Sequence, residues 1–323
     1  MRKFFYRWTL LAIMSCGIFC NAYAQNFPNK TIRIIVPFGA GGLADLSARI
    51  VAQKLSEQLS QSVVVENYPG AGGVVAAGIV AKANPDGYTL LLMSNANAIS
   101  ATLFKKLPHD NAKDFIPITT LGFFDLVVFT GSQSRYKNLQ EFLDAAKASP
   151  GELNLATINV GSTQNLTGEL FKEQSKSNIQ VVPFNGTPAV ISAVRGGQVD
   201  IGVDILGPIL PQINSGAIRV LALTGAERSP FLPGSPTAKE LGIKDFTVTA
   251  WNALAAPNKT PPAVVATLNK AIVAAVNSPD VQARFKEIGM EPKTTSVDEF
   301  QKFFAQEIVK WGAIINKANI PKQ

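Results

Sequence analysis

The segment with the clearest chemical character is residues 37–45, PFGAGGLAD. Its glycines, Gly39, Gly41 and Gly42, lie between an apolar, strand-like run and the start of a helical pattern. Without Cβ atoms, backbone N–H groups can approach a ligand closely, and a helix N-terminus adds partial positive charge. This pattern predicts contact with an anionic ligand. Asp45, in the first helical turn, is expected to balance the helix dipole and only secondarily to contact a ligand.

The same segment also fits a dinucleotide-binding fingerprint. Gly39, Gly41 and Ala44 form G-x-G-x-x-A, and Glu66 ends the next strand-like run, where such folds place a ribose-binding acid. A dehydrogenase would also need a catalytic acid or base, but the one histidine, His109, lies in a turn-like polar stretch expected at the surface. A dinucleotide-binding dehydrogenase therefore remains only a remote alternative. We expect no enzyme activity, no cofactor and no metal site.

Three further polar turns follow predicted strands. Residues 67–73, NYPGAGG, form a second glycine-rich turn, and residues 159–165, NVGSTQN, place hydroxyl and amide groups at a helix start. Residues 185–187 and Asp204 end two more strands. Ligands of open α/β sheets bind outside the carboxyl ends of the strands, so these turns are expected to border one crevice. The Ser and Thr side chains are either helix caps alone or caps that also contact the ligand.

Strand-like and helical patterns alternate along the chain, which predicts parallel sheets covered by helices. The first group has predicted strands at residues 31–38, 63–65 and 88–93, with helices starting at Leu43 and after Gly73. The second group has predicted strands at residues 126–129, 153–156, 180–184, 199–204 and 219–223, and a helix at residues 139–148. The chain is therefore expected to form two α/β lobes.

The C-terminal part is predicted to return to helix. Thr260 is expected to cap a helix whose first residue is Pro261, and Ser296 with Glu299 forms a capping box for the last helix. The apolar stripe of the last helix is expected to dock on the first lobe; it consists of Phe300, Phe303, Phe304, Ile308, Trp311 and Ile315. The chain would then cross between the lobes near residues 118–123 and 247–256. Two crossings predict a hinge.

The first 24 residues have the features of a secretory signal peptide. Basic residues come first, residues 9–20 form a short apolar core, and Ala22 and Ala24 match the small residues that signal peptidase recognises. Cleavage is therefore expected after Ala24, and the mature protein is expected in the periplasm.

Removal of this segment changes the chemistry available to the protein. Both cysteines, Cys16 and Cys20, are lost, so no disulfide or thiol site is expected; lipidation at either one is the alternative form of the same exported protein. The formal net charge falls from +7 to +4 because three basic and no acidic residues are removed. This mild charge without a basic cluster predicts no nucleic-acid partner and slightly favours anionic solutes.

Taken in order, the motifs of the chain resemble a known family. They are IIVPFGAGGLAD, VVVENYPGAGG, NPDGYTLLL, LPHDNAKDF, GELNLA, GST, GGQVDIGVD and IRVLALTGAERS, followed by the amphipathic last helix. This series resembles the Bug family, the substrate-binding proteins of tripartite tricarboxylate transporters, over essentially the whole mature chain. The resemblance implies a type II periplasmic-binding-protein fold: two lobes, each with a mixed, mainly parallel sheet wrapped by helices, joined by two crossover segments.

The function implied by the resemblance is capture of a small carboxylate, or a related small organic solute, by closure of the two lobes. The expected partners are that solute and two membrane-embedded transporter subunits, and the protein itself is expected to be a monomer. A periplasmic sensor that presents its bound solute to a signalling receptor is the alternative. The expected division is residues 1–24 as signal peptide, 25–123 with 248–323 as the first lobe, and 124–247 as the second.

The resemblance also implies which residues contact the solute. Family members hold a carboxylate against the loop at residues 38–45, partly through bridging water, and Trp251 lies where the family's returning strand passes the cleft. Asn165 stands where a histidine is common and Asn185 where a lysine or arginine is common, which argues against a second strongly charged carboxylate on the solute. The complete expected set is Phe38, Gly39, Ala40, Gly41, Gly42, Asp45, Gly161, Ser162, Thr163, Asn165, Asn185, Gly186, Thr187, Asp204 and Trp251.

Overall fold

The computed structural model describes residues 27–317 and 320–323, so the expected signal peptide and its cleavage site lie outside the described residues. The helices are α2 (Leu43–Leu59), the 3₁₀ turn η1 (Ala71–Gly73), α3 (Val74–Ala81), α4 (Asn95–Leu103), α5 (Leu139–Ala148), α6 (Thr163–Gln174), α7 (Thr187–Arg195), α8 (Leu206–Asn214), α9 (Pro262–Val276), α10 (Pro279–Glu287) and α11 (Val297–Lys317). None of them, within this part of the chain, combines the length and the apolar character needed to cross a membrane.

The strands form a mixed sheet in the order β2-β1-β3-β9-β4-β7-β5-β6, and β8 and β10 pair with β4 beside this path. Their bounds are β1 (Ile32–Val36), β2 (Val63–Asn67), β3 (Thr89–Ser94), β4 (Phe115–Gly131), β5 (Asn154–Ile158), β6 (Gln180–Phe184), β7 (Ile201–Ile205), β8 (Ile218–Leu223), β9 (Thr249–Pro257) and β10 (Glu291–Pro292). β1 is parallel to β2 and β3, and β5 is parallel to β6 and β7. The predicted alternation of strands and helices is confirmed.

The apolar run of β1 has the pattern of a central parallel strand. Four of its five residues are buried, as expected where helices cover both faces of a sheet. The helix that follows, α2, buries Ile50, Val51 and Leu55 at helical spacing. The strand and the helix therefore fix both ends of the glycine-rich turn between them.

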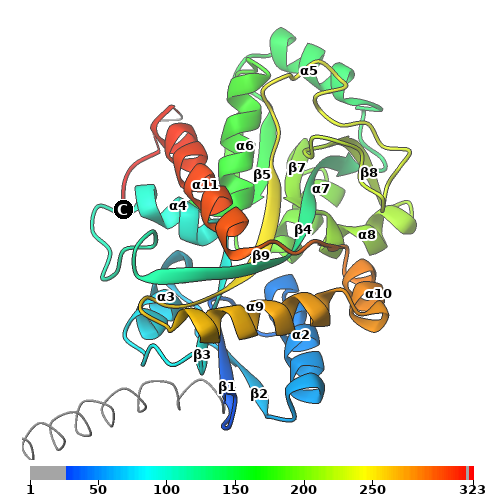
Figure 1. Ribbon diagram of the computed structural model, residues 1–323. Coiled ribbons are helices and arrows are strands. Elements are labelled where there is room, and N and C mark those ends of the chain that lie inside the picture. The colour runs from blue at the N-terminus through cyan, green and yellow to red at the C-terminus, as the bar shows by residue number, and fades with distance from the viewer. Residues whose placement is uncertain (1–26, 318–319) are drawn as a thin grey trace, which may run out of the picture.

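Two long strands connect the two halves of the sheet. β4 and β9 pair antiparallel, from Phe115 with Pro257 to Asp125 with Thr249. β9 also pairs with β3, whereas β4 continues beyond β9 to pair with β7 and β8. In Figure 1, β4 and β9 run from the group that contains β1, β2 and β3 to the group that contains β5, β7 and β8. The predicted crossings lie in these two strands.

The last helix, α11, packs mainly on α4 and β4, and it makes a smaller contact with α6 (Figure 1). Its predicted capping box is confirmed, because the Ser296 amide donates to Glu299 Oε2 at 2.8 Å and the Glu299 amide donates to Ser296 Oγ at 3.2 Å. The predicted apolar stripe is the packed face: Phe300, Phe304, Trp311 and Ile315 are buried.

A buried carboxylate fixes α11 to the rest of the fold. Glu307 Oε2 accepts hydrogen bonds from the indole Nε1 of Trp251 at 3.1 Å and of Trp311 at 3.0 Å, and from Asn95 Nδ2 at 3.2 Å. Lys310 Nζ lies 3.3 Å from Oε1 and supplies the opposite charge. Because a buried carboxylate is stable only with such donors, this cluster holds α11 against β9 and α4.

The helix α9 begins one residue later than predicted. Pro261 is its N-cap, with φ −55° and ψ 136°, and the Thr260 hydroxyl donates instead to the Pro257 carbonyl at 2.8 Å. The expected cap at Thr260 is wrong because a residue that precedes a proline avoids the helical conformation. Pro262 thus keeps Pro261 extended and moves the helix start.

His109 is buried, and the expectation of a surface residue is wrong. Its Nε2 lies 3.2 Å from Asn111 Oδ1, and its ring packs edge-on against Phe115. Nδ1 has no hydrogen-bond partner among the described residues. Asn111 Nδ2 in turn donates to Ser100 Oγ of α4 at 3.0 Å, which holds this turn against the core. Burial lowers the pKa of His109, and the hydrogen bond with Asn111 and the nearby carboxylates oppose this shift only in part.

We predict that His109 makes the protein less stable in mild acid. The unfolded chain binds a proton on this side chain near pH 6.5, whereas the folded chain does so only at lower pH, so the free energy of unfolding falls as pH drops below about 6.5. Urea unfolding at pH 7.5 and pH 5 should show a larger loss for the wild type than for His109→Gln, by about 1 kcal/mol. Equal losses in the two proteins would show that His109 does not control this pH dependence.

Candidate functional site

Six strands, three in each half of the sheet, end at the N-termini of helices. β1, β2 and β3 lead into α2, into η1 with α3, and into α4, and β5, β6 and β7 lead into α6, α7 and α8. The two sets approach each other. A Cβ added to Gly207, in the first turn of α8, would lie 3.2 Å from Leu43 Cδ1 at the start of α2. One added to Gly161 would lie 2.5 Å from Leu103 Cδ2 of α4, so the strand ends of both halves border one region.

The glycine-rich turn after β1 is held from inside by Asp45. This side chain is 2% exposed, and its Oδ2 accepts the Gly41 amide at 2.8 Å and Arg49 Nε at 2.9 Å. Asn67 Nδ2 donates to Oδ1 at 2.9 Å. Burial alone would raise the pKa of Asp45, but the donors Arg49, Gly41 and Asn67 outweigh burial and lower it. Asp45 is therefore ionised, paired with Arg49, and engaged with the turn itself.

The amides at the start of α2 remain free. Gly42 is the N-cap, with φ −76° and ψ 165°, and α2 has no side-chain cap. No acceptor among the described residues takes the amides of Gly42, Leu43 or Ala44, and Gly39 to Gly42 are exposed. Unpaired amides at a helix N-terminus favour an anion. Gly41, by contrast, gives its amide to Asp45, so the sequence-based expectation of direct contact fits Gly42 better than Gly41.

The turn after β5 repeats this arrangement in the other half. Gly161 has φ +79°, Gly41 has φ +83°, and the Gly161 amide donates to Asn165 Oδ1 at 3.1 Å, four residues ahead, as Gly41 does to Asp45. Asn165 Nδ2 donates to Thr157 Oγ1 at 3.2 Å. The difference lies at the N-cap, because Ser162 Oγ accepts the Asn165 amide at 3.0 Å. The α6 turn is therefore partly self-satisfied, whereas the α2 turn is open.

The helices after β6 and β7 each lack one amide in the first turn because of a proline. α7 has Gly186 as N-cap, and Pro188 in its first turn has no N–H, while the Ala189 amide donates to the Gly186 carbonyl at 3.2 Å. Thr187 begins the helix, and Asn185 just before it is exposed. α8 has no side-chain cap either, and its third residue is Pro208.

Asp204 lies near the end of β7 with its carboxyl group fully buried. Oδ1 accepts Gln164 Nε2 at 2.9 Å and the Ile205 amide at 2.7 Å. Oδ2 has no partner in hydrogen-bond geometry among the described residues. Burial raises the pKa of Asp204, and Gln164, the Thr187 hydroxyl and the Ile205 amide oppose the shift without cancelling it. A buried oxygen without a donor is costly and marks a place that a ligand or water can complete.

Trp251 is a core residue, which the sequence did not indicate. Its side chain is fully buried, it packs against Phe300, Phe303 and Phe304, and its indole donates to Glu307. The one polar atom of this side chain is already satisfied inside the core, so in this structure the indole has no free group for the expected ligand contact.

Two further polar residues join the expected set. Asn67, at the end of β2, donates to both Asp45 and the Phe38 carbonyl, and the strand-end rule applied to β6 and β7 would also have found it. Gln164 orients Asp204. Gln164 lies in the polar turn at residues 159–165, but its contact with Asp204 could not be predicted, since the direction of its side chain depends on how α6 rotates over β7.

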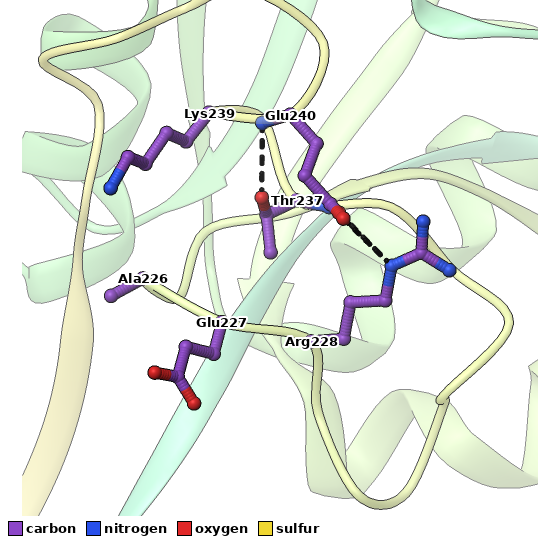
Figure 2. A pocket seen from close by; sticks show the side chains of 6 residues that line it. All are labelled: Ala226, Glu227, Arg228, Thr237, Lys239 and Glu240. Atoms are coloured by element: carbon purple, nitrogen blue, oxygen red, sulfur yellow. Dashed lines mark hydrogen bonds and ion pairs between the residues drawn. The ribbon is translucent and has the colours of Figure 1, made fainter.

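Figure 2 shows a surface hollow of about 420 Å³ beyond the end of β8, lined by Ala226, Glu227, Arg228, Thr237, Lys239 and Glu240. Its polar groups largely satisfy one another, because Arg228 Nε donates to Glu240 Oε1 at 3.0 Å and the Glu240 amide donates to Thr237 Oγ1 at 3.1 Å. A second hollow of about 400 Å³ lies where Lys317 of α11 pairs with Glu173 of α6. Neither contains an expected ligand residue.

The residues needed for the dinucleotide alternative are engaged elsewhere. Glu66, the candidate ribose acid, forms a two-point ion pair with Arg33, with N···O distances of 2.6 and 2.7 Å. Within residues 27–317 and 320–323, no three His, Cys, Asp or Glu side chains are placed to hold a metal ion.

Comparison with known proteins gives one consistent result. A family model described as "Tripartite tricarboxylate transporter family receptor" matches residues 47–320. The structure of the periplasmic binding protein BugD is 31% identical, with a TM-score of 0.80, and covers 92% of this chain and 100% of its own. MatC (Rpa3494) from Rhodopseudomonas palustris, with bound malate, is 32% identical, with a TM-score of 0.78 and coverage of 90% and 100%. R. palustris Rpa4515, with adipate, is 31% identical, with a TM-score of 0.81 and coverage of 91% and 99%.

The family model includes both connecting strands, and each of these structures covers at least 90% of the chain. The family consists of periplasmic solute-binding receptors and is not a family of enzymes. The expected periplasmic-binding-protein fold is confirmed. The chain belongs to the tripartite tricarboxylate transporter receptor family, the Bug proteins, and has a solute-binding role.

Proposed function

We propose that the mature protein, residues 25–323, captures a small carboxylate in the periplasm and delivers it to a transporter with two membrane-embedded subunits. The solute lies between a first lobe, residues 25–123 and 248–323, and a second lobe, residues 124–247. The protein acts as a monomer. The family match supports the delivery step, and the relatives solved with malate and adipate support a carboxylate as the solute.

The observation that carries the proposal is the uncapped start of α2. The amides of Gly42, Leu43 and Ala44 have no acceptor among the described residues, and the loop before them is exposed. The nearest carboxylate, Asp45, is neutralised by Arg49 and points into the turn. The turn therefore offers donors without a competing free charge, which suits a carboxylate bound directly or through one water.

Contact residues of the second lobe complete the proposed site. Gly161, Ser162 and Thr163 lie across from α4, and Asn165, Gly186, Thr187 and Asp204 lie at the neighbouring strand ends. Since β4 and β9 are the strands that join the two halves, bending of this pair would open and close the site. A solute that contacts both lobes binds the closed form better and shifts the population toward it.

Calorimetry on the mature protein tests this function. The probes are malate, adipate and a series of mono- and dicarboxylates of two to eight carbons, with NAD as the negative control. We expect saturable one-to-one binding of at least one carboxylate and none of NAD. Binding of NAD, or of no carboxylate in the series, would contradict the proposal.

A further inference from the structure

Two buried side-chain oxygens of the second lobe have no hydrogen-bond partner among the described residues, Oε2 of Glu173 and Oδ2 of Asp204. Glu173 pairs with Lys317 through its other oxygen, whereas Asp204 has no basic partner in the described part of the chain. The Asp204 side chain is 0% exposed, and its other oxygen already accepts two hydrogen bonds, from Gln164 and from the Ile205 amide. Asp204 lies beneath the first turns of α6 and α7, because Gln164 is the second residue of α6 and Thr187, whose hydroxyl also acts on this carboxyl, is the first of α7. The unpaired oxygen is thus at the strand ends that border the proposed site.

The two lobes differ in the groups that they leave unpaired at these strand ends. The first lobe presents the free amides of α2, which are donors. In the second lobe, Ser162 caps α6, Asn165 takes the Gly161 amide, and prolines remove an amide from the first turns of α7 and α8. The first turns of α6 and α8 still have amides without an acceptor among the described residues, those of Thr163, Gln164, Leu206 and Gly207. The fully buried group that is unpaired there, however, is an acceptor, Asp204 Oδ2.

Among the described residues, no cation balances Asp204. The three groups that act on its carboxyl are Gln164, Thr187 and the Ile205 amide, all of them neutral. A second carboxylate on the solute would therefore meet a buried carboxyl group without a basic side chain to offset the repulsion. A neutral N–H or O–H, or an ammonium group, would instead supply the donor that Oδ2 lacks.

We infer that the solute carries a hydrogen-bond donor, such as an amide, hydroxyl or ammonium group, opposite its carboxylate, and that Asp204 Oδ2 accepts this donor. The inference rests on the proposed function, because it assumes that the carboxylate end lies at the start of α2. It makes Asp204 the residue that discriminates between a dicarboxylate and a carboxylate with a neutral polar end.

Matched pairs of probes test this inference by calorimetry. Each pair is a dicarboxylate and its monoamide: succinate with succinamate, glutarate with glutaramate, and adipate with adipamate. For the chain length that binds best, the wild type should bind the monoamide at least about tenfold more tightly, the cost of leaving one buried acceptor unpaired.

The variant Asp204→Asn keeps the acceptor for Gln164 and Ile205 but places an amide where Oδ2 was. Its N–H groups suit a carboxylate, so the preference for the monoamide should shrink to within about threefold or reverse. The matched control is Asp200→Asn, just before the other end of β7, where Asp200 accepts the Tyr136 hydroxyl and the Asn154 amide. This control should keep the wild-type preference.

The outcomes separate the two claims. The inference is contradicted if the wild type binds a dicarboxylate at least as tightly as its monoamide, or if Asp204→Asn keeps the wild-type preference. Either result would leave carboxylate binding intact. Binding of no probe, together with no binding in the wider carboxylate series, contradicts the proposed function and the inference with it.

Discussion

Gly42→Val is expected to weaken binding of the carboxylate by about a hundredfold or more. Gly42 has φ −76°, which valine adopts without strain, and an added Cβ would make only an ordinary 3.7 Å contact with the Gly39 carbonyl oxygen. The branched side chain would instead occupy the space in front of the free amides. Loss of two charge-assisted hydrogen bonds, each worth about 1.5–3 kcal/mol, gives this magnitude.

Two other glycines sharpen the test of Gly42. Gly234 lies in an exposed loop with nothing within 4 Å of an added Cβ, so Gly234→Val should bind like the wild type. Gly41 has φ +83° and gives its amide to Asp45, so Gly41→Val should lose stability as well as binding. Full affinity in Gly42→Val, measured by calorimetry with circular dichroism unchanged, would show that the start of α2 is only a turn.

Gly207→Val is expected to abolish closure and to weaken binding by about a hundredfold, because the solute would then keep the contacts of one lobe only. Gly207 of α8 lies against the segment between α10 and β10. An added Cβ would collide with the Ile288 carbonyl oxygen, and a Cβ on the facing Gly289 would lie 2.8 Å from Gly207 Cα. Only two glycines allow these backbones, one from each proposed lobe, to approach so closely.

The fold itself should tolerate this change. In the open form the two segments separate, and valine has a higher helix propensity than glycine, so the free energy of unfolding without solute should not fall. Small-angle scattering should show a radius of gyration that decreases with solute in the wild type and stays constant in Gly207→Val, with Gly207→Ala intermediate. Wild-type affinity and normal contraction in Gly207→Val would exclude this contact from the mechanism.

The sequence predicted the parts of the site that depend on local backbone chemistry. The glycines after β1, the capping box at Ser296 and Glu299, and the order of strands and helices all follow from turn residues and periodicity over short stretches. The hydrogen bond from the Gly41 amide to Asp45 could also have been predicted from the sequence, since both residues lie in one turn.

What the sequence could not provide depends on contacts between distant segments. From its position in the sequence, Trp251 was expected to line the cleft. In the structure its indole donates instead to Glu307 of α11, which is 56 residues away in the sequence. His109 was expected in an exposed polar turn, but Asn111 holds that turn against α4 and thereby buries the histidine. The unpaired oxygen of Asp204 could be recognised only once α6, α7 and β7 are packed together, because it depends on no donor among the described residues reaching Oδ2 in hydrogen-bond geometry.

The most direct test of the proposed site is a crystal structure of the mature protein with adipate or the tightest carboxylate found by calorimetry. We expect a carboxylate oxygen within about 3 Å of the amide nitrogen of Gly42, Leu43 or Ala44, directly or through one water, and the rest of the solute in contact with the second lobe. A solute seated instead in the surface hollow of Figure 2, or touching one lobe alone, would contradict this account of binding.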